Sequence, residues 1–222
     1  MSNLLHLLST QWRPLLQLTL LVVALNVVNY TLLTYMPTYL QLRIGLDPAQ
    51  ALYVPIVGML FMMLFLPLAG SLSDKIGRKP LWWVSLAGLT VLAIPAHHLM
   101  SSGPWFAGVG FVLMGLLYVP QLATISATFP AMFPTPVRFA GLAIAYNVST
   151  SLFGGMAPAL NSWLVGKTGD LLVPAYLMMG ACLVGMTALP FVIETTGCSL
   201  RGDGIPGFVG EVQMTSQTTT PG

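Results

Sequence analysis

Long apolar runs alternate with short polar connections along this chain, and the runs set the elements that we expect. A helix that crosses a hydrocarbon core of about 30 Å needs roughly 20 residues, because each residue adds about 1.5 Å. The runs that reach this length cover residues 15–40, 49–72, 81–99, 105–129, 139–165 and 171–193. Their apolar positions are continuous rather than alternating, which favours helices over the strands of a membrane barrel.

The first and fifth runs contain residues that oppose a regular helix. Pro37 lacks a backbone donor and predicts a bend near the end of the first run. In the fifth run, Gly154, Gly155 and Pro158 follow a stretch of hydroxyl side chains at 149–151. Irregular backbone at membrane depth is tolerated where it lines a cavity, so we expect the fifth run to lie beside one.

Composition places the chain in the membrane class. Of its 222 residues, 55% are hydrophobic and only 6% are charged, whereas a soluble domain carries about 25% charged residues. The net charge of +2 is small and scattered, which argues against a nucleic-acid surface. Residues 194–222 are rich in Gly, Ser and Thr and have little apolar content, so they are predicted to be a disordered tail.

The basic residues of the connections predict the orientation. One side holds Arg13, Lys75, Arg78, Lys79, Arg138 and Arg201, and the other holds Arg43 and Lys167. Because Lys and Arg concentrate in cytoplasmic loops, both termini are expected in the cytoplasm. The expected organisation is a cytoplasmic flank at 1–14, a transmembrane domain at 15–193 and a cytoplasmic tail at 194–222.

The stretch GSLSDKIGRK, residues 70–79, concentrates charge between the second and third runs. Gly70 is expected to allow close approach of a neighbouring helix, and Gly77 a tight reversal that a Cβ would oppose. Asp74 can accept hydrogen bonds from basic side chains or from a helix N-terminus, and Arg78 and Lys79 can reach it or lipid phosphates. Anchoring alone would need only the basic residues, so we expect this cluster to hold helices together in one state and release them in another.

This stretch resembles the loop that joins the second and third helices of each six-helix half in the major facilitator superfamily. Two further stretches, YTLLTYMPTYL at 30–40 and FPAMFPTPVRFAGLAIAYN at 129–147, resemble the metabolite:proton symporters of that superfamily, especially the proline/betaine transporters. The exit of the last run, IETTGCSLRG, matches more loosely, and the resemblance extends from about residue 15 to residue 202.

The resemblance implies an all-α integral membrane protein, with six transmembrane helices arranged as two inverted three-helix units. It matches the C-terminal half of a twelve-helix transporter of the bacterial inner membrane. The implied function is proton-coupled uptake of proline or glycine betaine by alternating access. The alternatives are a different small metabolite (a dicarboxylate, a sugar or a drug) or a non-transporting fragment. A dicarboxylate would favour a basic residue within a span, and none is present. The chain is then a fragment, a truncated reading frame, or one member of a split or dimeric assembly.

One departure from the family concerns Arg138. Many facilitators place Glu before the Phe-Pro-Thr of the second loop, whereas this chain has Ala131 and Met132. An acid-to-Arg138 contact is therefore not available at that place, although Arg138 stays among the expected gating residues.

Polar side chains within the runs are the candidates for substrate contact. They are Asn26, Asn29, Tyr30, Tyr35, Tyr118, Gln121 and Asn147. Such groups are costly in a membrane unless they face a cavity or another helix, so interhelical hydrogen bonding is the competing interpretation. A zwitterion such as proline or betaine needs hydrogen-bond donors for its carboxylate and aromatic faces for its cationic nitrogen, and this set supplies both.

Proton coupling has no evident group in this chain. All six acidic residues fall in loops, at helix ends or in the tail, so the titrating group of a proton symporter is expected in the other half. His97 and His98 close the third run and are expected at the membrane interface. No metal-spaced cluster, nucleophile elbow or phosphate loop is present, so we expect no enzyme activity, cofactor or metal. The expected partners are a small zwitterion, a proton, membrane lipids, and a separate N-terminal half or a second copy.

Overall fold

The computed structural model describes residues 12–194, and within that range every regular element is a helix. The long elements are α4 (Pro48–Ile76), α5 (Arg78–Met100), α6 (Pro104–Ala131) and α9 (Val173–Ala188). Short 3-10 turns, η2 (Thr135–Val137) and η4 (Leu189–Phe191), precede α7 and follow α9. Of the predicted flank at 1–14, residues 12–14 are helical because α2 begins at Trp12, and of the predicted tail at 194–222 only Glu194 is described; the rest of both segments lies outside the described residues.

Two further elements are composite, because a π-helical segment interrupts each of them. The first consists of α2 (Trp12–Asn29), the π segment η1 (Tyr30–Tyr35) and α3 (Met36–Leu42). The second consists of α7 (Arg138–Ser149), the π segment η3 (Thr150–Gly154) and α8 (Met156–Thr168).

Five helices of residues 12–194 are long and apolar enough to cross a membrane. They are Trp12–Leu42, Pro48–Ile76, Arg78–Met100, Pro104–Ala131 and Val173–Phe191. Five of the six expected spans are thus confirmed by length and composition. The expectation of one continuous span at 139–165 is corrected: the backbone there divides into helices of 12 and 13 residues on either side of η3.

A proline follows each π segment, and its position contributes to each interruption. Pro37 lies in the first turn of α3, and Pro158 lies in the first turn of α8. Proline removes one backbone hydrogen bond and its ring clashes with the carbonyl four residues earlier. A wider π turn before the proline accommodates both effects. The bend predicted at Pro37 is therefore found as an irregular segment that ends at Tyr35.

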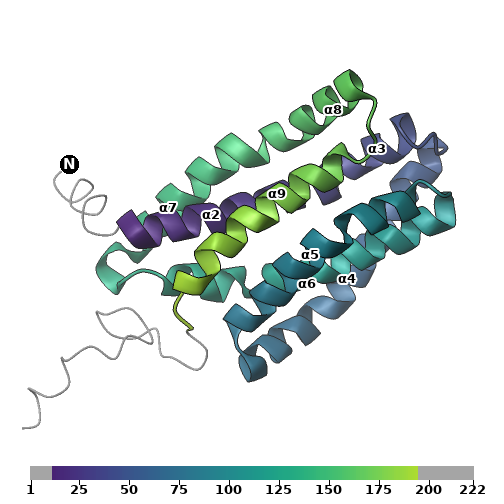
Figure 1. The fold of residues 1–222 in the computed structure, drawn as a ribbon. Helices are drawn as coiled ribbons and strands as arrows, with labels where there is room; N and C mark the ends of the chain where they lie inside the picture. The colour runs from purple at the N-terminus through teal and green to yellow at the C-terminus, as the bar shows by residue number, and fades with distance from the viewer. Residues whose placement is uncertain (1–11, 195–222) are drawn as a thin grey trace, which may run out of the picture.

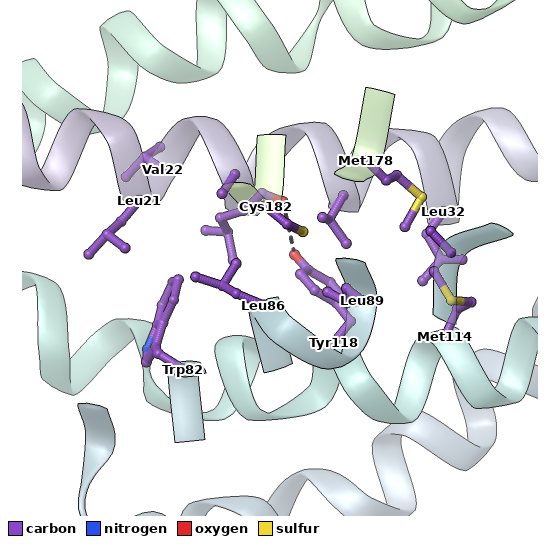
Figure 2. Close-up of a cluster of buried hydrophobic side chains, with 14 of the residues drawn as sticks. Leu21, Val22, Leu32, Trp82, Leu86, Leu89, Met114, Tyr118, Met178 and Cys182 are labelled. Atoms are coloured by element: carbon purple, nitrogen blue, oxygen red, sulfur yellow. Dashed lines mark hydrogen bonds between the residues drawn. The ribbon is translucent and has the colours of Figure 1, made fainter. Parts of the chain in front are cut away.

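The helices form two groups. Helices α4, α5 and α6 pack together, α2 packs on α7 and α9, and the α5–α9 contact joins the groups (Figure 1). Between the groups lies a core of buried side chains (Figure 2). Leu86 of α5 and Cys182 of α9 belong to it, and the aromatic rings of Trp82 and Tyr118 close it.

The basic residues separate toward the two ends of the bundle. Arg78 Nη1 donates to the Ala127 carbonyl near the end of α6, and Lys79 Nζ donates to the Pro190 carbonyl after α9. At the opposite end, a guanidinium nitrogen of Arg43 lies against Gly166, one residue before Lys167. The charge asymmetry expected from the connections is therefore an asymmetry between the two ends of the folded chain.

Gly185 provides a test of the α2–α9 packing. A Cβ at Gly185 would lie 2.7 Å from the Cβ of Ala24, whereas a Cβ at Gly180 on the same helix meets nothing within 4 Å. We expect Gly185→Ala to lower the free energy of unfolding by about 1–3 kcal/mol, because the backbones must separate. Gly180→Ala should leave it unchanged or raise it by up to about 1 kcal/mol, through helix propensity. Thermal unfolding in detergent measures both, and equal effects would contradict the close approach.

Candidate functional site

Polar side chains of the first span meet those of α6 and η3 inside the bundle. Asn26 Nδ2 donates to Thr150 Oγ1 at 2.9 Å, and Asn29 Nδ2 donates to the Tyr118 hydroxyl at 2.9 Å. The Tyr118 hydroxyl is 3.5 Å from the Leu25 carbonyl, to which it donates. Three expected substrate residues are thus linked by hydrogen bonds between helices, as the competing interpretation has it.

Burial distinguishes the members of this group. Asn26 and Tyr118 are buried, whereas Asn29 and Tyr30 are half-buried. The Tyr30 ring packs against Gly154, where an added Cβ would lie 2.6 Å from the ring. Asn29 and Tyr30 therefore keep part of their surface exposed, and the Tyr118 hydroxyl holds the Asn29 amide in place.

The remaining candidates lie elsewhere. Tyr35 is buried near Ser162 and Arg43, toward the end of the bundle opposite the 70–79 loop. Gln121 is fully buried between α5 and α6, where its Nε2 donates to Ser85 Oγ at 2.8 Å. The structure therefore does not gather all seven predicted residues into one site.

Asn147 lies on the wall of a groove between α6 and α7. This groove has a volume of about 500 Å³, and aromatic side chains of Phe129, Phe139 and Tyr146 line it together with Asn147. Asn147 is exposed, and its Nδ2 donates to the Ala143 carbonyl of its own helix. Of the predicted residues, it is the one with the most open position.

Asn161 of α8 is a polar residue that the sequence analysis missed. It is fully buried, and its Nδ2 donates to Thr31 Oγ1 at 3.0 Å and to the Ala157 carbonyl at 2.9 Å. An amide within an apolar run was the available signal, because an unpaired amide in a membrane is costly. The glycines and the proline before Asn161 predicted an irregular backbone, and that prediction concerned only the start of α8.

His97 lies in the last turn of α5. It is fully buried against other helices, with Nδ1 2.8 Å from the Ala93 carbonyl and its ring edge-on to Tyr39 at 5.8 Å. His98 is exposed, as predicted. Helical geometry places neighbouring residues on different faces, and the pattern alone did not show which face meets α3.

The 70–79 loop joins α4 to α5 through Gly77, and a carboxylate from the other end of the chain holds it. Gly77 has φ +111°, which confirms the tight reversal. Glu194 accepts from the Arg78 amide at 3.1 Å and from the Lys79 amide at 2.9 Å. These are the unpaired amides of the first turn of α5, so Glu194 caps that helix with favourable charge. A Cβ at Gly77 would lie 3.0 Å from Glu194 Oε2.

Asp74 and Gly70 lack the contacts that we expected of them. Asp74 is exposed and makes no hydrogen bond or ion pair within residues 12–194. Nothing lies within 4 Å of a Cβ built at Gly70. The capping role expected of Asp74 belongs to Glu194, because α4 continues to Ile76 and carries Asp74 away from the start of α5.

Arg138 begins α7 at the same end of the molecule. It is buried, and its Nε donates to the Phe133 carbonyl at 3.2 Å. The Phe133 ring in turn packs against Gly141, where a Cβ would lie 2.6 Å away. Arg138 therefore organises the connection between α6 and α7 through a backbone carbonyl. Among the described residues, no group of three or more His, Cys, Asp or Glu side chains is placed to hold a metal ion.

Membrane-length helices with polar side chains paired between them are typical of a multi-pass membrane protein. The family model for sugar (and other) transporters matches residues 1–202, so the chain belongs to this family of the major facilitator superfamily.

Curated relatives agree with this assignment. The chain is 38% identical over 195 residues to an ectoine/proline transporter of Corynebacterium glutamicum, and the match covers 86% of this chain. It is 37% identical over 196 residues to a proline/betaine transporter of Escherichia coli, again over 86% of this chain. A putative proline/betaine transporter of Staphylococcus haemolyticus is 36% identical over 186 residues, or 82% of this chain. The match spans 38%, 38% and 39% of the lengths of these relatives, respectively.

The cap at α5 generates a paired prediction. We expect Glu194→Ala to destabilise the chain by about 1–3 kcal/mol, because two charge-assisted hydrogen bonds to helix amides are lost. Asp74→Ala should change the free energy of unfolding by less than about 0.5 kcal/mol, as for a surface residue without contacts. Thermal unfolding of both variants in the same detergent measures the difference. A larger loss for Asp74→Ala would show that the loop is held by the other carboxylate.

Proposed function

We propose that this chain forms one half of a secondary transporter that takes up zwitterionic solutes of the proline and glycine betaine type by alternating access. Membership of the transporter family and relatives named for proline, betaine and ectoine support this function. The observation that carries it is the polar cluster of Asn29, Tyr30 and Tyr118, placed where the first span loses its regular hydrogen bonding.

The cluster has the chemistry that a zwitterion requires. The amide of Asn29 and the hydroxyl of Tyr30 can donate to a carboxylate, and the Tyr30 ring offers an aromatic face to a cationic nitrogen. Both residues are half-buried, so part of each side chain stays exposed for contact with a solute. Asn147 and the aromatic groove beside it would extend this binding surface.

The membrane topology is part of the same proposal. Residues 138–168, at about 1.5 Å each, are long enough to cross a hydrocarbon core of about 30 Å despite the break at η3. They would supply a sixth crossing, and the crossings would then form two three-helix units of inverted topology. An even number of crossings puts both ends of the domain on one side. The basic end would face the cytoplasm of a bacterium, with the chain in the inner membrane.

Proton coupling is assigned to a partner half. Asp47, Asp74, Asp170 and Glu194, the acidic residues of the described range, lie at helix ends or in connections. A carboxylate that exchanges its proton within the membrane has to lie near the middle of a span, facing a cavity. This chain would then contribute solute contacts and gate movement.

The 70–79 loop would serve as the cytoplasmic gate. Glu194 fixes the α4–α5 junction to the end of α9 within this half. The exposed carboxylate of Asp74 is then available to a group outside the described residues, which we propose to be the facing loop of the partner half.

Uptake of labelled proline and glycine betaine tests the function. Cells without their own osmolyte carriers would express the chain alone, or together with the N-terminal half of the Escherichia coli relative. Saturable uptake with the added half supports the proposal, and uptake by the chain alone would point to a working dimer. Membrane expression without uptake of either solute would overturn the assigned substrate class, and labelled sugars and dicarboxylates would then test the alternatives.

Asp74 is tested in the same assay. We expect Asp74→Asn to reduce uptake roughly tenfold without reducing membrane insertion, because a charge-assisted contact of about 1.5–3 kcal/mol is lost in one state. Asp74→Glu should restore part of the rate, and a fluorescent fusion measures insertion. Unchanged uptake in Asp74→Asn would mean that the loop serves only as a topological anchor.

A further inference from the structure

The two π segments, η1 and η3, are about 120 residues apart in the sequence, yet the Tyr30 ring of η1 packs against Gly154 of η3, while η1 also packs on α8 and η3 on α2. We propose that Asn161 and Thr31 tie these segments into one coupled hinge, so that α3 and α8 change position together. Asn161 is then a positioning residue, which acts on the solute cluster through the first span.

Both segments have the local features of a hinge. Each has wide-turn hydrogen bonding, and each precedes a proline that prevents a regular ladder. Other prolines, including Pro55, Pro67 and Pro95, lie within helices without such a segment. Proline alone therefore does not produce the wide turn. At η1 and η3, the two π segments of the described residues, the wide turn is accompanied by hydrogen bonds between the first span and the η3–α8 region.

Three contacts join the first span, which contains η1, to η3 and α8. Asn26 bonds to Thr150 where η3 begins, and Asn161 bonds to Thr31 within η1. Between these bonds, the Tyr30 ring lies against Gly154, leaving no room for a Cβ. A shift of one segment along its axis would break both hydrogen bonds and drive the ring into the facing backbone unless the other segment shifted too.

The contacts of α8 show which element holds this helix in place. Helix α8 contacts η1, η3 and α9, and its opposite face exposes Met156, Leu160 and Trp163. The buried side of α8 is thus held largely by the first span. The Thr31–Asn161 bond is fully buried, since both side chains have zero exposure, so lipid and water cannot readily replace it.

The side chain of residue 161 is an amide, which supports a specific hydrogen bond to Thr31 rather than apolar packing alone. Asn161 Oδ1 is buried without a hydrogen-bond partner among the described residues. An apolar side chain of similar volume would avoid that penalty, so the amide is retained for what its Nδ2 contacts. Because Tyr30 lies on η1, movement of α8 would be transmitted to a side chain proposed to contact the solute. This use in transport rests on the proposed function, whereas the coupling itself does not.

Hydrogen–deuterium exchange of the full chain in lipid nanodiscs tests the coupling. Thr31→Val removes the hydroxyl that Asn161 binds and keeps the shape of the side chain. We expect amide exchange to accelerate about tenfold in residues 30–42 and to a similar extent in residues 156–168, because both open as one unit. Thr31→Ser keeps the hydroxyl and should restore slow exchange in both segments.

Thr34→Val is the matched control, since Thr34 lies on the same π segment with an exposed side chain. It should leave exchange unchanged in both segments. Acceleration confined to residues 30–42 in Thr31→Val would overturn the coupled hinge, and so would no acceleration at all. Because the measurement needs no solute and no partner half, a failed uptake assay would leave its result standing.

Discussion

The structure depends on the requirement that a backbone in hydrocarbon satisfies its own hydrogen bonds. Regular helices meet this requirement over α4, α5 and α6. The regular helical hydrogen bonding is interrupted before Pro37 and Pro158. The backbone there forms π turns, and the residues around these turns carry amide and hydroxyl side chains. The polar side chains that we assign to solute contact and to coupling are therefore concentrated where the backbone cannot be regular.

The same requirement shapes the end of the bundle that carries most of the charge. The first amides of α5 have no partner within their own helix, and Glu194 supplies one from beyond α9. One carboxylate thereby connects the α4–α5 junction to the segment that follows α9. The adjacent basic side chains, Arg78 and Lys79, extend this connection to carbonyls near the ends of α6 and α9. This end is thus a rigid platform on which the exposed Asp74 is presented.

The two ends of the domain differ in how they are held. At the basic end, backbone carbonyls and Glu194 join three helices to one loop. Toward the opposite end, α3 and α8 follow the π segments; a buried amide–hydroxyl pair joins α8 to η1, and the Tyr39 hydroxyl of α3 donates to the Leu171 carbonyl. In the transport function that we propose, the basic end would stay fixed while the far ends of α3 and α8 move, an asymmetry that alternating access could use.

Hydrophobicity and local residue types determined the class, the five continuous spans, the reversal at Gly77 and the irregular places near Pro37 and Gly154, because each depends on residues close in sequence. Which polar groups meet was decided only by the tertiary structure. Asn26, Asn29 and Tyr118 were predicted as candidates, but their pairing joins residues about 90 or more positions apart. The replacement of Asp74 by Glu194, the burial of His97 and the role of Asn161 likewise required knowing which helix faces meet, because an apolar run in a membrane is hydrophobic on all its faces.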